Sequence, residues 1–103
     1  MKFLIFNMCE VPKVPEVGQL TDKLTASLPP GINVQAIYAT QGLAFPGQPA
    51  NTLVAIAIVE AESNLAIAAF QWPISVAGAT LWTVPALEVP VGGAAEVEKK
   101  ARG

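Results

Sequence analysis

The side chains able to perform acid–base or nucleophilic chemistry are few in this 103-residue chain, which contains no histidine. Histidine is the commonest general base and the commonest metal ligand, so its absence removes most motif-borne chemistries and predicts no metal site. One thiol, Cys9, and two neighbouring carboxylates, Glu60 and Glu62, remain as candidates. No glycine-rich phosphate loop or zinc-ligand spacing occurs in the sequence, and we expect no cofactor.

Cys9 has a functional and a structural interpretation. As a nucleophile or redox thiol, it needs a nearby cation, a helix N-terminus or a charged partner to lower its pKa. As a strand residue among apolar neighbours, it fits the small buried role that free cysteines usually have. A single cysteine cannot close an intramolecular disulfide, so the sequence favours a reducing, cytoplasmic compartment.

The carboxylate pair has a simple structural explanation. Glu60 and Glu62 precede Ser63, a candidate helix N-cap, at the place where a helix dipole favours negative charge. Catalysis is therefore not needed to account for them, and no catalytic residue is assigned from the sequence.

Several polar or amphipathic side chains stand within strands that are otherwise apolar. The candidate ligand-binding residues are Asn7, Cys9, Tyr38, Trp82 and Thr83, and Gln35 shares their pattern. An apolar pocket with a few hydrogen-bonding groups is the usual form of a small-molecule site. Tyrosine and tryptophan fit the core of a dimer equally well.

Hydrophobic periodicity predicts the elements that position these residues. The expected elements are strands over residues 2–10, 32–40, 52–60 and 79–89, and helices over 15–28 and 64–72, the second stopped or kinked by Pro73. With 52% hydrophobic and 14% charged residues, most of the chain should be buried in one domain. We expect that domain to span residues 1–90, and residues 91–103 to be a frayed helix or a disordered tail.

This order of elements is the split βαβ unit of α+β, ferredoxin-like folds, βαββαβ, in which a four-stranded antiparallel sheet carries two helices on one face. The uncovered face is expected to hold several of Phe3, Ile5, Val54, Ile56, Ile58, Trp82 and Val84, or their neighbours if the parity is opposite. An apolar face of this kind is not left in water. We therefore expect a homodimer through the sheet faces, since two-fold assemblies are the commonest oligomers.

The long loop over residues 41–51 has two interpretations. It contains Leu43 and Phe45 among glycines and prolines. Long loops in small domains often act as lids over a site. The alternative is that these two side chains pack across the dimer.

Three runs carry a family resemblance. They are Met1-Lys2-Phe3-Leu4-Ile5, Val59-Glu60-Ala61-Glu62-Ser63, and the stretch from Trp72-Pro73 to Thr83-Val84-Pro85. Residues 1–90 resemble the dimeric α/β barrel, or ferredoxin-like, superfamily, and within it small prokaryotic domains of unknown function. The resemblance implies the βαββαβ fold and a sheet-to-sheet dimer. Because the superfamily includes isomerases, monooxygenases, haem proteins and ligand-binding regulatory domains, it implies no single function. Relatives that hold haem iron do so through histidine, which this chain lacks.

Charge and hydropathy exclude two classes of partner. The net charge is −2, and basic residues cluster only at Lys99, Lys100 and Arg102, so no nucleic-acid partner is expected. The longest apolar run, Leu53–Val59, is far shorter than the about 18 residues that a membrane span needs.

Two functional hypotheses remain open. In the first, the chain is a homodimeric small-molecule-binding, regulatory or accessory module that favours an uncharged or weakly polar, largely apolar ligand. In the second, it is a cofactor-free isomerase or monooxygenase-like enzyme for a small apolar or aromatic substrate. There the pocket positions the substrate while Glu60, Glu88, Tyr38 or Cys9 moves a proton.

Overall fold

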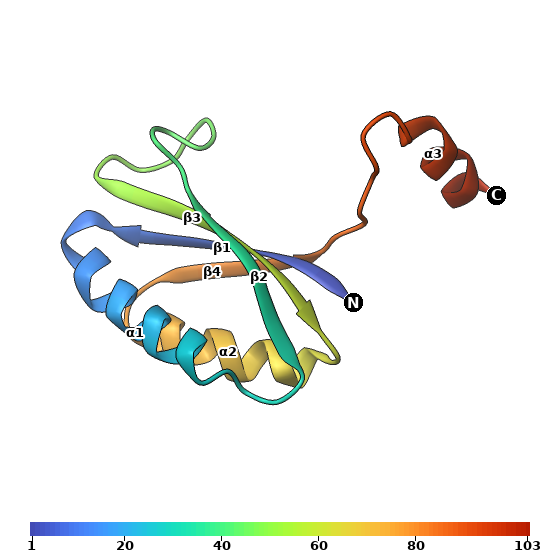
Figure 1. The fold of residues 1–103 in the computed structure, drawn as a ribbon. Helices are drawn as coiled ribbons and strands as arrows, with labels where there is room; N and C mark the ends of the chain where they lie inside the picture. Colours follow the sequence, from blue (N-terminus) through green and yellow to red (C-terminus); the bar gives the residue numbers. More distant parts are fainter.

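Four antiparallel strands form one sheet in the order β2-β3-β1-β4, and two helices, α1 and α2, lie on the same face of it (Figure 1). The computed structural model describes residues 1–103. The elements are β1 (Lys2–Glu10), a 3₁₀ turn (Val11–Lys13), α1 (Val14–Ala26), β2 (Ile32–Ala39), β3 (Thr52–Ala61), α2 (Asn64–Val76), β4 (Thr80–Pro85) and α3 (Ala94–Arg102). The predicted α+β, ferredoxin-like βαββαβ fold is confirmed.

Strand β1 lies in the middle of the sheet and pairs on both sides. Phe6, for example, lies opposite Ile56 of β3 and opposite Trp82 of β4. Because side chains alternate between the two faces of a strand, Phe3 and Ile5 point toward the helices and are buried. We call this side the helix face and the opposite side the open face.

Each helix buries one stripe against the helix face. Pro15 stands in the first turn of α1, where a missing N–H costs nothing, and Val17 is the fully buried residue of that helix. The predicted cap of α2 is present, since the Ser63 hydroxyl accepts a hydrogen bond from the Ala66 N–H at 3.1 Å. The small side chain of Ala57 on β3 packs against this core.

Helix α2 extends beyond the predicted range at its C-terminal end. Of the two outcomes expected at Pro73, a stop or a kink, the helix does not stop but continues to Val76. The proline leaves one carbonyl in the preceding turn without its N–H partner, but the extension buries Ile74, which is 1% exposed. A two-layer fold gives a helix only one neighbouring face, so the other side of α2 is not covered.

The outer side of α2 is consequently apolar and exposed. Leu65, Trp72 and Val76 are 79%, 67% and 88% exposed.

No helix of the chain is long and apolar enough to cross a membrane.

Strand β4 ends at Pro85, earlier than the predicted residue 89. Proline cannot donate to the ladder, and one further backbone bond, from the Ala86 N–H to the Lys2 carbonyl at 2.9 Å, closes the pairing. The chain then leaves the sheet toward α3, which stands apart from the rest of the molecule (Figure 1). No residue of α3 is buried, and the division of the chain at residue 90 stays a prediction.

A β-bulge in β2 changes which residues face the helices. The register with β3 shifts between Val34 and Ala36, so Gln35 is an extra residue in that strand. Val34 faces the helices, whereas Tyr38, opposite Ile56, lies on the open face. An uninterrupted alternation over residues 32–40 would put Val34 and Tyr38 on one side, and the bulge is the reason that they lie on opposite sides.

The open face of the sheet is apolar along all of its central length. Its residues include Leu4, Phe6, Met8, Val54, Ile56, Ile58, Trp82 and Val84. Five of the seven residues expected there are present, but Phe3 and Ile5 lie on the helix face. Both faces of β1 are apolar, so hydrophobicity could not distinguish them.

The loop over residues 41–51 folds against the open face. The rings of Phe45 and Trp82 form an edge-to-face contact with centroids 6.2 Å apart, and Trp82 stacks on Phe6 at 5.5 Å. The buried side chain of Gln48 holds the loop, accepting from the Ala44 N–H at 2.6 Å and donating to the Thr52 hydroxyl at 3.0 Å.

A buried and an exposed valine predict a difference between matched substitutions. Val59, which is fully buried on the helix face, should lose about 2 kcal/mol of unfolding free energy when changed to Ala, because methyl groups leave a packed core. Val76→Ala removes the same atoms from a residue on the outer side of α2 that is 88% exposed, and should cost clearly less. Urea denaturation of both variants measures the difference. Equal losses would contradict this assignment of the core.

Candidate functional site

A cavity of about 240 Å³ lies between α1 and the helix face of the sheet. Its walls come from both sheet-covering helices and all four strands, and 11 of its 15 lining residues are hydrophobic. Small side chains leave this space: Ala55 and Ala57 of β3 line it on the sheet side, and Gly18 lines it on α1. An apolar hollow with few polar groups is the form that small-molecule sites usually take.

The most informative polar group in the cavity is the side chain of Asn7. Its Oδ1 atom is buried and has no hydrogen-bond partner. Asn7 lies between Ile5 and Cys9 on β1, so strand alternation places it on the helix face with these two buried residues. A buried acceptor without a partner costs about 1–3 kcal/mol, and native proteins leave few of them. The cavity therefore contains an acceptor that the chain itself does not satisfy.

The other polar lining groups are already bonded, protonated or exposed. The Thr21 hydroxyl donates to the Val17 carbonyl at 2.8 Å within α1. Burial raises the pKa of the Cys9 thiol, so the thiol is protonated at neutral pH. Asp22 stands on the exposed side of α1, and the lining contains no lysine or arginine.

The entrance of the cavity is marked by its exposed lining residues, which are Gly18, Asp22 and Ile37. Gly18 lies in the middle of α1, where glycine destabilises a helix by about 1 kcal/mol relative to alanine. A Cβ atom built on Gly18 would meet nothing within 4 Å, and the residue has no positive φ. Neither packing nor backbone conformation therefore requires glycine at this position.

The structure brings together two of the five predicted ligand-binding residues. Asn7 and Cys9 both line the cavity. Thr83 is on the helix face but outside the lining, and its hydroxyl donates to the Gln71 side-chain oxygen of α2 at 2.5 Å. Tyr38 and Trp82 belong to the open face, on the other side of the sheet.

Sequence reasoning missed the entrance residues Gly18, Asp22 and Ile37. A glycine within the amphipathic pattern of residues 15–28 was the available signal for Gly18.

Residues 41–51 contribute nothing to the lining, so the loop is not a lid over this cavity.

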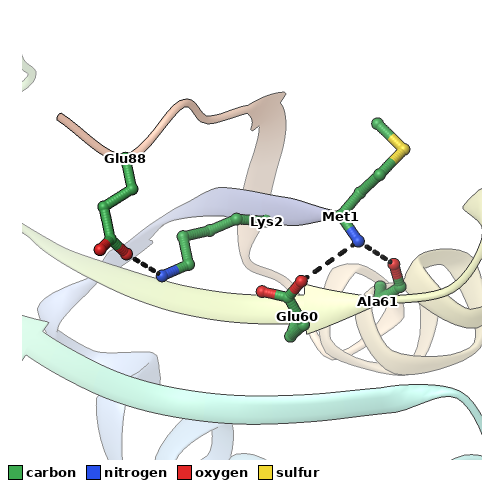
Figure 2. A network of polar contacts seen from close by, with 5 residues as sticks. All are labelled: Met1, Lys2, Glu60, Ala61 and Glu88. Atoms are coloured by element: carbon green, nitrogen blue, oxygen red, sulfur yellow. Dashed lines mark hydrogen bonds and ion pairs between the residues drawn. The ribbon is translucent and has the colours of Figure 1, made fainter. Parts of the chain in front are cut away.

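The carboxylates considered for proton transfer lie elsewhere. Figure 2 shows Glu60 with its Oε1 3.2 Å from the Met1 amino group, which also donates to the Ala61 carbonyl at 3.0 Å. The Lys2 ammonium donates to Glu88 at 2.7 Å (Figure 2), and this hydrogen bond holds the pKa of Glu88 below its usual range. Both carboxylates thus form surface ion pairs, and neither lines the cavity. No three carboxylate or thiol side chains gather where they could hold a metal ion.

The fold is similar to a solved domain from another protein. The solution structure of the C-terminal domain of the MgtC protein from Mycobacterium tuberculosis matches with a TM-score of 0.60, covering 81% of this chain and 84% of that domain. The two sequences are 9% identical, so the likeness concerns the fold alone. No protein-family model matches the sequence, and comparison with curated proteins gives no significant match.

The environment of Cys9 predicts how its reactivity depends on pH. Desolvation raises its pKa, and only the thiolate is nucleophilic, so the alkylation rate should keep rising at pH values where an ordinary thiol has reached its plateau. Labelling with N-ethylmaleimide, followed by mass spectrometry, reports on this single cysteine. The protein unfolded in urea serves as the control. A folded-state midpoint at or below the unfolded one would contradict the desolvated position of the thiol.

Proposed function

We propose that this chain is a small-molecule-binding module that takes one uncharged, mostly apolar molecule in the cavity beneath α1. The observation that carries the proposal is the unpartnered Oδ1 of Asn7 inside an apolar hollow. An unsatisfied acceptor lowers stability, and a ligand that donates to it recovers the lost hydrogen bond.

The charge of the lining argues for a neutral ligand. A buried anion needs a cation or several donors to offset its desolvation, and no lysine or arginine lines the cavity. The one charged lining residue, Asp22, is exposed and would repel an anion.

Binding is better supported than catalysis. Of the four groups considered for proton transfer, only Cys9 lines the cavity, and burial raises its pKa, which opposes formation of the thiolate. Glu60 and Glu88 are held in ion pairs outside it, and Tyr38 lies on the open face. The isomerase or monooxygenase-like alternative therefore has no activated base at this site.

An accessory or regulatory role fits the same observations. The similar solved fold is described as the C-terminal domain of MgtC, and is thus one part of another protein. A binding module without its own catalytic group would act through whatever it is attached to or assembles with.

The cavity hypothesis predicts which of three related probes binds. Benzyl alcohol, benzylamine and benzoate share one ring and differ in charge. Benzyl alcohol at about ten times its Kd should stabilise the protein by about 1.4 kcal/mol, whereas benzylamine and benzoate, which are charged at neutral pH, should not. Thermal-shift assays and native mass spectrometry measure this.

Ala55→Leu, which fills the cavity wall, is the control variant and should abolish the shift. Equal stabilisation of that variant would place the binding elsewhere. If none of the three probes binds, the proposed function is wrong.

We further propose that a second copy covers the open face. Phe6, Ile56 and Ile58 form its centre, and Tyr38 beside them is 61% exposed. Two ion pairs border it at one end (Figure 2): Lys2 with Glu88, and Glu60 with the Met1 amino group. An apolar centre with a charged margin is the usual anatomy of a protein interface, and a two-fold axis lets identical faces meet.

Ile56→Asp should convert this dimer into a folded monomer, because the charge would be buried at the interface but not in the core. Leu65→Asp, on the exposed outer side of α2, is the matched control and should remain dimeric. Light scattering at micromolar concentration gives the mass, and circular dichroism checks the fold. A monomeric wild type would contradict the proposal, as would a dimeric Ile56→Asp variant.

A further inference from the structure

We infer that the ligand carries a single N–H or O–H donor directed at Asn7, and that Gly18 is the residue that admits it. This inference rests on the binding function proposed above and names the chemical class: neutral apolar donors such as phenols, indoles and apolar alcohols.

The polar groups of the cavity differ in whether they already have a hydrogen-bond partner. Asn7 Oδ1 is an acceptor without a partner. The hydroxyl of Thr21 already donates to Val17, and the neutral Cys9 thiol is a weak donor. The one buried polar side-chain atom without a partner is therefore an acceptor, which is complementary to a ligand that donates.

The residues paired with Asn7 across the sheet offer no substitute for that donor. They are Ala55 on β3 and Leu81 on β4, and neither side chain has a polar atom. Both neighbours also line the cavity. A ligand must therefore place its polar end against the sheet and its apolar body toward α1.

Gly18 is one of the exposed lining residues, whereas Asn7 Oδ1 is buried. A Cβ atom on Gly18 would stand in open space. Because neither φ nor contacts require glycine, the structural consequence of the missing side chain is free space at the entrance beside Asp22 and Ile37. A larger side chain would occupy the route to Asn7.

The donor is tested with two probes of nearly the same shape. Indole has one N–H donor, and benzofuran has an ether oxygen in its place. Isothermal titration should show indole binding the wild-type protein about tenfold more tightly than benzofuran. Asn7→Leu should bring this ratio to about one while benzofuran still binds. It should also unfold at a higher temperature than the wild type when no ligand is present, since it removes an unpaired polar atom.

The entrance is tested by Gly18→Leu. This change improves helix propensity, so the variant should fold and be at least as stable as the wild type, yet it should weaken both probes at least tenfold. Gln19→Leu, at the adjacent exposed residue of α1 that does not line the cavity, is the matched control and should bind normally.

Each result bears on a different statement. Equal affinities of indole and benzofuran for the wild type would overturn the donor inference while leaving the binding function intact. An unchanged ratio in Asn7→Leu would overturn the assignment to Asn7. Unchanged binding to Gly18→Leu would overturn the role of the entrance, and no binding of either probe would overturn the proposed function itself.

Discussion

The pairing of β1 on both of its edges is the constraint on which the rest of the structure depends. Side chains of directly paired residues point to the same face of a sheet, so a central strand fixes which residues of both neighbours face each side. The residues opposite Phe3 and Ile5 on β3 therefore face the helices with them. Asn7 belongs to the same series and cannot leave the helix face without moving the buried residues on either side of it. The unsatisfied acceptor is thus a direct consequence of a register that the core stabilises.

A single layer of helices on a sheet that is apolar on both sides has two consequences. Beneath α1, the small residues Ala55, Ala57 and Gly18 leave a hollow that larger side chains would have filled. On the other side of the sheet, no helix covers the apolar residues, although Phe45 from the loop packs on Trp82. The candidate ligand site and the candidate dimer face therefore lie on opposite sides of the same strands.

Local patterns were sufficient to predict most elements but not their orientation. Helix periodicity located α1, and Ser63 marked the start of α2, because capping is a short-range interaction. Whether Pro73 would stop or only kink α2 could not be predicted, since the gain from burying Ile74 lies outside the local sequence. The bulge at Gln35 was also unpredictable, because it exists only as a mismatch between β2 and its partner strand.

The sequence by itself determined the order of elements, the α+β fold and the absence of histidine chemistry, because composition and periodicity are properties of the chain alone. It also picked out Asn7 and Cys9 as polar or reactive groups on an apolar strand. Only the tertiary structure decided that these two share a cavity with Gly18 of α1, whereas Tyr38 and Trp82 lie across the sheet. The physical reason is that a side chain's face depends on the register with neighbouring strands and on which face the helices cover. Both are settled by packing between segments far apart in the chain.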